Sequence, residues 1–335
     1  MSNVVKWGIL GTAGIARKAV VPAILRAENA EVMAVASSSN KQKAEEFADL
    51  FDIPKRYGSY EELLDDQEIQ AVYIPLPNHL HATWVKKAAE KGKHILCEKP
   101  VSLTEKETKS MIEVCEQNNV VFMEAFMYQF HPQHQRVKEL IESETIGEVT
   151  SMRSAFSFFM DVEAQAQNIR LNREFGGGSL FDIGCYCLHV SQYILEKEPN
   201  QVYVSGHIPP EFGVDLTAAG ILSFEGGITA SFSCSFQQPF ENHYTIIGTK
   251  GRIDVPAAFR PDVTEGDGRI IVTNQNGETT EERLSGDQYV LQIEHLSTCV
   301  LTGETPIYDN EAMLKNMKVL EACHKSLHEN RQITL

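Results

Sequence analysis

Short apolar strands alternate with helices over the first 125 residues of this chain, and this alternation restricts its fold more than any other feature. The candidate strands are residues 4–10, 32–36, 56–57, 71–77, 94–97 and 120–125. Each of the first five is followed by a helical pattern, and after the last one the alternation of strands and helices ends. Strands that alternate with helices form a parallel sheet covered by helices on both faces. Residues 1–125 are therefore predicted to be an α/β domain with a doubly wound parallel sheet, typical of Rossmann dinucleotide-binding domains.

Residues 126–335 follow a different pattern, and the change falls near residues 124–128. The segment 228–236 alternates between apolar and Ser/Thr side chains, as a strand with one buried face does. Glycine-containing turns have hairpin spacing at residues 226–227, 248–251 and 276–277. Helices are expected near residues 133–141, 287–301 and 311–329. This region is predicted to be an α+β domain with a large, open-faced, mostly antiparallel sheet for substrate binding and oligomerisation.

The charge of the chain argues against nucleic-acid and membrane partners. The 30 basic and 46 acidic residues give a net charge of −16, and no run of Lys or Arg appears. A surface of this sign repels phosphate groups. No apolar run is long enough to span a membrane, and the N-terminus lacks a signal-peptide pattern. Seven cysteines without metal-ligand spacing indicate reduced thiols, so we expect a cytoplasmic protein without a metal site.

A glycine turn joins the first strand to the first helix, which is expected to run to about Arg26. Such a turn lets backbone N–H groups approach a pyrophosphate at the positive end of the helix. The full G-x-G-x-x-G pattern is absent, because alanine takes the place of the second glycine. A tight turn without a ligand would use the same residues. The candidate cofactor contacts here are Gly11, Thr12, Ala13, Gly14 and Ile15.

The end of the second strand bears on the choice between NAD and NADP. NAD sites place a carboxylate about twenty residues after the glycines to bind the ribose 2′-hydroxyl. This chain has no acid there before Glu45, and instead offers Ser37, Ser38 and Lys41. Hydroxyl and ammonium groups can hold a 2′-phosphate, which favours NADP. A serine turn that caps the next helix is the structural alternative.

Charged residues follow the fifth candidate strand directly. Glu98 and Lys99 stand at its carboxyl end, where an open parallel sheet faces its ligand crevice. Pro100 ends the strand and holds Lys99 in an extended conformation. A surface Glu–Lys pair would give the same sequence. The preceding strand ends at Pro77 and Asn78, and His81 is interpreted as lining the cofactor rather than as a metal ligand, because no third ligand has matching spacing.

A second polar segment follows the glycines of residues 176–178. Asp182, Tyr186 and His189 are spaced i, i+4 and i+7, which places them on one face of a helix. A carboxylate, a phenol and an imidazole on one face are suited to proton transfer. A polar helix face with a core tyrosine and an interior histidine is the alternative interpretation.

The chain resembles the Gfo/Idh/MocA family of oxidoreductases over almost its full length. The resemblance is closest to the branch of aldose dehydrogenases, dihydrodiol dehydrogenases and glucose–fructose oxidoreductase. It rests on residues 11–16, 78–81, 98–100, 124–128 and 176–186. It implies NAD(P) on the first domain, a substrate over the sheet of the second, and homodimers or homotetramers formed through that sheet.

The resemblance also assigns roles by position. Lys99 matches the catalytic lysine of the family, Asp182 its carboxylate and Tyr186 its acid–base residue. The expected cofactor contacts also include Pro77, Asn78, His81, Glu98 and Lys99. The candidate substrate contacts are Glu124, Arg170 and His189.

Two positions depart from the pattern of this branch. Ala13 replaces a glycine, which affects the pyrophosphate contact, and Gln129 stands where the branch usually has arginine, which affects the polar partners of the substrate.

Tyr186 and His189 are the two candidates for the acid–base residue. Histidine has the more suitable free pKa near neutrality. The pKa of tyrosine, about 10, becomes usable when an ammonium lies within roughly 4–6 Å. Because Tyr186 lies in the first turn after the glycines, proton transfer is assigned to Tyr186 and a supporting role to His189.

The sequence thus predicts an NADP-preferring oxidoreductase that transfers hydride to or from a secondary hydroxyl or carbonyl of a sugar, cyclitol or related diol. An NAD-dependent inositol dehydrogenase is one alternative. A non-catalytic nucleotide-binding sensor or regulator is the other, and the complete set of Lys99, Asp182 and Tyr186 argues against it.

Overall fold

The computed structural model describes residues 4–38, 40–264 and 266–335, and it divides into two compact units. Unit 1 comprises Met1–Met127 and Tyr289–Leu314, and unit 2 comprises Tyr128–Gln288 and Lys315–Leu335. This division differs from the predicted segments 1–125 and 126–335, because residues 289–314 return to unit 1. Side-chain contacts explain the return: the Trp7 indole donates to Ser297 Oγ at 3.1 Å, and Asn29 Nδ2 donates to the Glu294 carbonyl at 2.9 Å.

Unit 1 contains the predicted parallel sheet, with strand order β3-β2-β1-β4-β5-β6. Every pairing in it is parallel. The order reverses between β1 and β4, which is where doubly wound sheets bind ligands. The strands are β1 (Val5–Leu10), β2 (Ala30–Ala36), β3 (Lys55–Tyr57), β4 (Ala71–Ile74), β5 (His94–Cys97) and β6 (Phe122–Glu124).

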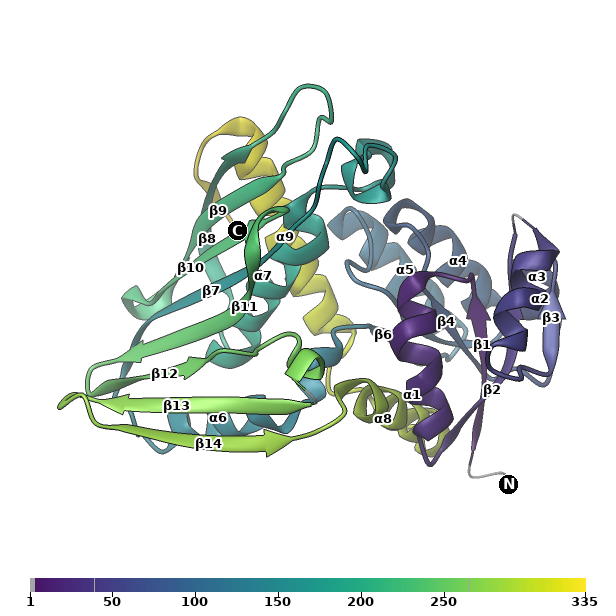
Figure 1. The fold of residues 1–335 in the computed structure, drawn as a ribbon, viewed down its shortest axis with the longest axis horizontal. Helices are drawn as coiled ribbons and strands as arrows, with labels where there is room; N and C mark the ends of the chain where they lie inside the picture. The colour runs from purple at the N-terminus through teal and green to yellow at the C-terminus, as the bar shows by residue number, and fades with distance from the viewer. Residues whose placement is uncertain (1–3, 39, 265) are drawn as a thin grey trace. The chain divides into compact units, whose positions relative to one another are not determined.

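The helices of unit 1 lie against this sheet (Figure 1). They are α1 (Val21–Arg26), α2 (Lys41–Asp49), α3 (Tyr60–Asp65), α4 (Asn78–Glu90), α5 (Glu105–Gln117) and most of α8 (Gln288–Thr302). The helix expected from the glycine turn to Arg26 begins instead with a π-helical segment, Ala16–Val20. The Thr104-x-x-Glu107 spacing is typical of a helix start, and the Thr104 side chain accepts from the Glu107 N–H at 3.2 Å and caps α5.

Unit 2 contains a nine-stranded sheet in the order β14-β13-β12-β11-β7-β10-β9-β8-β15. Among the described strand pairs, β7 and β10 run parallel and the other neighbours run antiparallel, so the predicted mostly antiparallel sheet is confirmed. The strands are β7 (Val149–Phe159), β8 (Pro199–His207), β9 (Thr217–Phe224), β10 (Thr229–Ser235), β11 (Gln237–Gly248), β12 (Gly251–Val255), β13 (Asp267–Asn274), β14 (Thr279–Ser285) and β15 (Ile333–Thr334).

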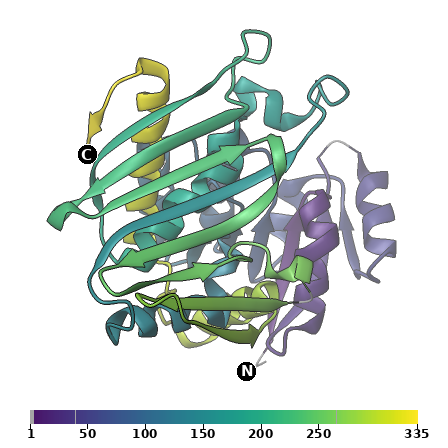
Figure 2. The ribbon, with the colours of Figure 1, turned by 60° about the vertical axis from the view of Figure 1, so that its left-hand side comes forward.

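Helices cover one face of this sheet, and Figure 2 shows the strands in front of them. They are α6 (Pro132–Glu142), α7 (Cys185–Leu195) and the part of α9 (Asn310–Glu329) that belongs to unit 2. The Val204 N–H of β8 donates to Ser326 Oγ of α9 at 2.9 Å. In β10, Ala230, Phe232 and Cys234 are buried, which agrees with the alternation in the sequence.

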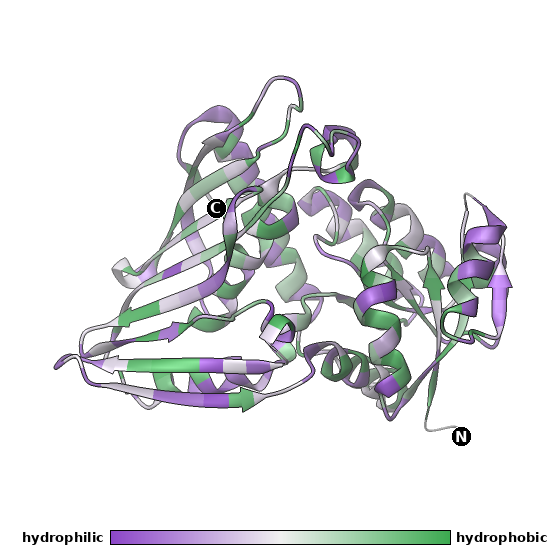
Figure 3. Cartoon of the chain, viewed as in Figure 1, coloured by the Kyte–Doolittle hydropathy of each residue, from purple (hydrophilic) through white to green (hydrophobic). Residues whose placement is uncertain are grey.

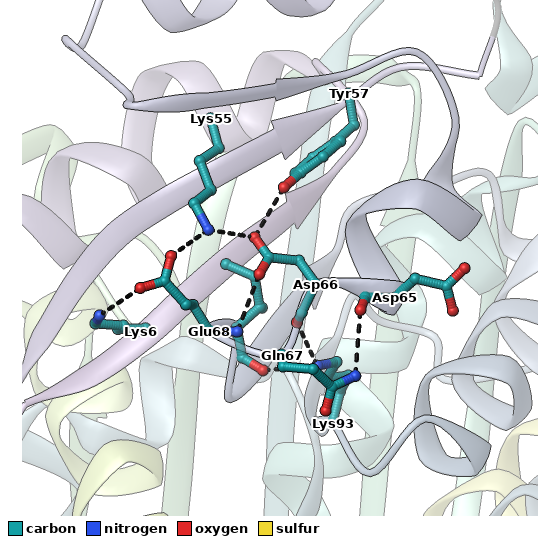
Figure 4. Close-up of polar contacts among 9 residues, drawn as sticks. Lys6, Lys55, Tyr57, Asp65, Asp66, Gln67, Glu68 and Lys93 are labelled. Atoms are coloured by element: carbon teal, nitrogen blue, oxygen red, sulfur yellow. Dashed lines mark hydrogen bonds and ion pairs between the residues drawn. The ribbon is translucent and has the colours of Figure 1, made fainter.

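Unit 1 carries a cluster of charges before β4 and β5 begin, and Figure 3 shows the hydrophilic character of neighbouring β3. We call Lys6, Lys55, Tyr57, Asp66, Glu68 and Lys93 the amino-edge cluster. Lys55 Nζ lies 2.7 Å from Asp66 Oδ2 and also contacts Glu68 (Figure 4). The Tyr57 hydroxyl donates to Asp66 Oδ2 at 2.8 Å. These contacts fix the segment that enters β4.

Two further findings bear on the sequence-based expectations. Among the described residues, no helix is long and apolar enough to cross a membrane. Each of the seven cysteines is a buried free thiol.

Candidate active site

The glycine turn after β1 has the backbone conformation that the sequence predicts. Gly11 has φ +114°, a region that side chains rarely allow, and a Cβ there would lie 3.2 Å from Leu76 Cδ2. Gly14 is exposed, and a Cβ on it would have no neighbour within 4 Å. Thr12, Ala13 and Ile15 are partly exposed. The turn therefore leaves room at the start of a helix, which fits the pyrophosphate of a dinucleotide.

The residues expected near a ribose 2′-phosphate follow β2. The Ser37 N–H donates to the Tyr57 carbonyl at 3.2 Å, and the Ser37 side chain is buried. Ser38 and Lys41 are exposed, and Asn40 caps α2 by accepting from the Gln42 N–H. Ser38 and Lys41 are thus available to an anionic ligand, whereas Ser37 has a structural contact.

Four buried or half-buried side chains hold the backbone on either side of Lys99, and we call Tyr73, His81, Glu98 and Glu124 the lysine frame. The Tyr73 hydroxyl hydrogen-bonds to Glu98 Oε1, and the Lys99 N–H lies 3.3 Å from Glu98 Oε2. The Lys99–Pro100 peptide bond is cis. Lys99 therefore leaves the carboxyl end of β5 from a backbone fixed by its neighbours.

His81 links two segments of this edge of the sheet. Its Nε2 lies 2.8 Å from the Leu76 carbonyl, and its Nδ1 lies 2.9 Å from the Pro100 carbonyl. Complete burial lowers the pKa of His81 to about 4, against hydrogen bonds that raise it. The imidazole is therefore neutral at pH 7 and donates to one carbonyl at a time. Leu76 also contacts the Gly11 turn, so His81 connects that turn to Pro100.

Glu124 is enclosed rather than open to solvent. The residue is 1% exposed, the Val101 N–H donates to its Oε1 at 2.8 Å, and the Tyr308 hydroxyl donates to its Oε2 at 3.1 Å. Burial raises the pKa of Glu124 to about 8, while these two donors and Lys99 lower it. Glu124, which the sequence analysis expected to contact substrate, thus hydrogen-bonds to the chain itself through both of its carboxylate oxygens.

In unit 2, the triple glycine packs against backbone and a buried carboxylate. A Cβ on Gly177 would lie 2.5 Å from the Arg170 carbonyl, and one on Gly178 would lie 2.4 Å from Asp215 Oδ1. Asp215 accepts from the Ser179 hydroxyl at 2.6 Å and from the Leu180 N–H at 2.8 Å. These contacts fix the start of the helical segment that carries Asp182 and Tyr186.

Arg170 and Asp182 form an ion pair in unit 2. Arg170 Nε lies 2.6 Å from Asp182 Oδ2. The carboxylate raises the pKa of Arg170 most strongly, burial opposes this, and Tyr186 contributes to the rise. Residues 180–184 are π-helical, so the spacing that predicted one common face for Asp182, Tyr186 and His189 does not apply there. Tyr186 is the second residue of α7, the regular helix that follows, and is 6% exposed.

His189 lies in the interior of unit 2. Its Nδ1 lies 2.5 Å from the Tyr128 hydroxyl, and its ring stacks on Tyr193. Burial lowers the pKa of His189 to about 3. A neutral, enclosed imidazole fits the supporting role that the sequence assigned to it.

The structure also reveals supporting residues that sequence reasoning missed, namely Tyr73, Asp215 and Tyr308. Each reaches its partner from a distant part of the chain, and no local motif marks any of them. Among the described residues, no group of three or more His, Cys, Asp or Glu side chains could hold a metal ion.

Known proteins resemble this chain over both units. The family model described as an oxidoreductase family with an NAD-binding Rossmann fold matches residues 5–126. The model of the GFO/IDH/MocA C-terminal domain matches residues 134–254. The D-xylose 1-dehydrogenase (NADP(+)) 2 of Haloferax volcanii is 39% identical over 98% of this chain and 99% of that protein. The trans-1,2-dihydrobenzene-1,2-diol dehydrogenase of Xenopus laevis is 33% identical over 90% of this chain and 92% of that protein.

Solved structures are similar over nearly the whole chain. The 3-ketoreductase KijD10 from Actinomadura kijaniata, in complex with NADP and TDP-benzene, has a TM-score of 0.91 at 28% identity and covers 97% of this chain and 98% of its own. The aldose-aldose oxidoreductase from Caulobacter crescentus, complexed with glycerol, has a TM-score of 0.90 at 27% identity and covers 99% of this chain and 100% of its own.

Proposed function

This chain belongs to the GFO/IDH/MocA oxidoreductase family, and we propose that it is an NADP-preferring dehydrogenase or reductase of a sugar, cyclitol or related diol. One observation in unit 1 carries the proposal. The Leu76 side chain lies beside the Gly11 turn, where a Cβ on Gly11 would meet it, and His81 lies between the carbonyls of Leu76 and Pro100, next to Lys99. The glycine turn and Lys99 thus lie at the same edge of the sheet. A nicotinamide-dependent enzyme needs its cofactor site and its catalytic groups to be close in this way. The names of the two dehydrogenase relatives support the substrate class.

NADP is the preferred cofactor in this proposal. The segment after β2 contains no acidic side chain before Glu45, and it exposes Ser38 and Lys41. A carboxylate would repel a 2′-phosphate, whereas a hydroxyl and an ammonium attract it. The NADP named in the xylose dehydrogenase and bound in the ketoreductase structure supports this choice.

In the proposed hydride transfer, Tyr186, Lys99 and Asp182 each have a separate role. Bound NADP supplies the carbon that accepts or returns the hydride. In the oxidation direction, Tyr186 takes the proton of the substrate hydroxyl as the C–H bond gives up its hydride, which leaves a carbonyl. The ammonium of Lys99 stabilises the developing alkoxide. Asp182, held by Arg170 at 2.6 Å, orients a polar group of the substrate.

We also propose that the chain forms a homodimer or homotetramer through the open face of the unit 2 sheet. Tyr203 and Ile221 are 43% and 50% exposed on β8 and β9, and Ser231 and Ser233 of β10 are half-buried. A sheet face of aromatic, aliphatic and small polar side chains is suited to a protein partner. Sedimentation at micromolar concentration tests this, and a monomer would contradict it.

A substrate panel tests the proposed reaction. Aldoses, inositols and diols are offered with NADP⁺ and with NAD⁺, and reduced nicotinamide is followed by its absorbance. We expect turnover of an aldose or diol with a higher kcat/KM for NADP⁺. Turnover of inositols with NAD⁺ alone would support the inositol dehydrogenase alternative instead, and nucleotide binding without turnover would support a sensor.

A pair of variants tests the acid–base assignment. Tyr186→Phe should lower kcat by about 10²–10⁴-fold with little change in NADP binding. His189→Asn should mainly affect stability or KM, because the ring is enclosed by Tyr128 and Tyr193. The assignment is wrong if His189→Asn damages kcat more while Tyr186→Phe stays active.

A further inference from the structure

Glu124 occupies a position from which it can control the backbone next to Lys99. It is the last residue of β6 and pairs in register with Cys97, the last residue of β5. The Ala125 N–H donates to the Cys97 carbonyl at 2.8 Å, so the two strands stay paired to their ends. Glu98 and Lys99 follow directly on β5. The Glu124 carboxylate therefore lies beside the point where the chain leaves the sheet.

Both carboxylate oxygens of Glu124 accept hydrogen bonds from unit 1. Oε1 accepts from the Val101 N–H at 2.8 Å, two residues after Lys99, and Oε2 accepts from the Tyr308 hydroxyl at 3.1 Å. Tyr308 lies in the loop between α8 and α9. Its ring packs edge-on against the ring of Phe126, with 5.9 Å between the ring centroids. One buried side chain thus bridges the turn after Lys99 and a segment 184 residues further along the chain.

We propose that Glu124 is a positioning residue for Lys99, which it controls by accepting hydrogen bonds from the Val101 N–H and the Tyr308 hydroxyl and through the charge of its own carboxylate. This inference rests on the proposed role of Lys99 in hydride-transfer chemistry. It also changes the role of Glu124, from the substrate contact expected from the sequence to a residue that acts through Lys99.

The charges around Glu124 are of both signs. Lys99 lowers the pKa of Glu124, whereas burial and Glu98 raise it, and the balance is about 8. Cys97 also faces it, and the pKa of that thiol is raised by burial and by both carboxylates. Tyr308 donates from the facing loop. Because Glu124 is ionised above about pH 8, it stabilises the Lys99 ammonium in the alkaline range in which lysines lose their proton.

The chain offers a matched control at the other edge of the same sheet. Asp66 accepts a tyrosine hydroxyl, Tyr57, at 2.8 Å and a backbone N–H, that of Glu68, at 3.0 Å. Glu124 has the same two kinds of donor. Asp66→Asn and Tyr57→Phe therefore alter the same two kinds of hydrogen bond as Glu124→Gln and Tyr308→Phe, but in the amino-edge cluster, where Asp66→Asn also removes the ion pair with Lys55.

Labelling of Lys99 tests the inference without any substrate. The full-length protein is treated with acetic anhydride at a series of pH values, and acetylation of Lys99 is measured by mass spectrometry. In Glu124→Gln, the pH midpoint for labelling Lys99 should fall by about 0.5–1 unit, because a nearby carboxylate charge is lost. Tyr308→Phe should alter the labelling rate of Lys99 in the same comparison. Asp66→Asn and Tyr57→Phe should leave the midpoint and the rate unchanged.

Turnover provides the second measurement. Glu124→Gln should lower kcat by about 10-fold or more, with the Kd for NADP⁺ within about threefold of wild type, because a displaced lysine affects the reaction more than cofactor binding. Tyr308→Phe should change kcat in the same direction by a smaller factor. A purely structural role would lower the thermal midpoint but leave both the labelling midpoint and kcat unchanged, and that result would overturn the inference.

Different results would contradict the proposed function and the proposed role of Glu124. If the wild-type protein oxidises no sugar, cyclitol or diol, the proposed function fails, while the labelling of Lys99 still tests the role of Glu124. If Glu124→Gln does not fold, Tyr308→Phe still tests it, because phenylalanine preserves the ring contact with Phe126 and removes only the donor to Glu124. Unchanged labelling and kcat in Tyr308→Phe would then overturn the inference.

Discussion

The two edges of the unit 1 sheet hold polar side chains in opposite ways. In the amino-edge cluster, charges pair with each other, as Lys55 does with Asp66 at 2.7 Å. In the lysine frame at the carboxyl edge, buried side chains bond to backbone groups, as Glu124 does to Val101 and His81 to Pro100. Paired charges neutralise one another and stabilise a loop, whereas the backbone contacts of the lysine frame fix the chain on either side of Lys99, the residue that we propose to be catalytic.

The pKa values of the two carboxylates, Asp66 and Glu124, also differ between the edges, because Asp66 pairs with a lysine and Glu124 is buried. Burial raises the pKa of Asp66, but hydrogen bonds from Lys55, Glu68 and Tyr57 lower it to about 2. At the carboxyl edge, burial dominates and raises the pKa of Glu124 to about 8. A carboxylate that is always ionised is suited to a structural role. A buried carboxylate with a raised pKa beside a lysine is the kind of group found at candidate functional sites, which agrees with the role proposed for this edge.

The largest effect should follow from removing the lysine itself. Lys99→Met keeps the length of the side chain and deletes its ammonium, so kcat should fall by about 10³-fold. The thermal midpoint should change little, since the hydrogen bonds that the lysine frame makes to the backbone around residue 99 remain in this variant. A kcat within tenfold of wild type would contradict the proposal that the carboxyl edge, unlike the amino edge, carries a catalytic lysine. Steady-state rates with the preferred substrate and thermal melts provide the two measurements.

The second prediction concerns the cofactor segment at the same carboxyl edge. Ala36 and Ser37 are buried, so Ser38 is the position at which a carboxylate can be added without burying it. Ser38→Asp should weaken NADP⁺ binding by about tenfold through repulsion of the 2′-phosphate, and it should leave NAD⁺ within about threefold. Fluorescence titration of both cofactors measures this. Ser38→Asn is the uncharged control, and equal losses for NADP⁺ and NAD⁺ would contradict the 2′-phosphate assignment.

The sequence predicts those parts of this edge that depend on local signals. The alternation of strands and helices, the glycine turn and the capping of α5 by Thr104 are all short-range patterns, and the structure contains each of them. The Glu98-Lys99-Pro100 segment ends β5, as its apolar run and proline indicate.

Long-range contacts were not predictable in this way. Tyr308 reaches Glu124 only because residues 289–314 pack in unit 1, and nothing in the local sequence of that segment indicates it. Asp215 reaches the triple glycine from the segment before β9 for a similar reason. The π-helical segment at residues 180–184 also escaped prediction, because a helical pattern read with 3.6 residues per turn assumes regular geometry.

At the amino edge we expect an effect on stability alone. Asp66→Asn removes the carboxylate that Lys55 and Tyr57 contact, and it should lower the free energy of unfolding by about 1–2 kcal/mol. The thermal midpoint at pH 7 should fall by about 1–3 °C, with kcat within twofold of wild type. A kcat loss above tenfold would show that the amino edge also takes part in catalysis. Calorimetry and steady-state kinetics separate these outcomes.

The smallest expected effect is the pH dependence of that stability difference. The pKa of Asp66 is about 2 in the folded chain, below its ordinary value of 3.8, so the stabilisation is complete above about pH 4 and is lost as the pH falls through 2. The difference in unfolding free energy between wild type and Asp66→Asn should therefore be about half as large at pH 3 as at pH 7. Asp49→Asn provides the control for net charge, because Asp49 is 66% exposed where it pairs with Arg56. Urea unfolding at each pH measures both differences, and an equal Asp66→Asn difference at pH 3 and pH 7 would contradict the lowered pKa, since only a carboxylate that titrates in this range can lose its contribution there.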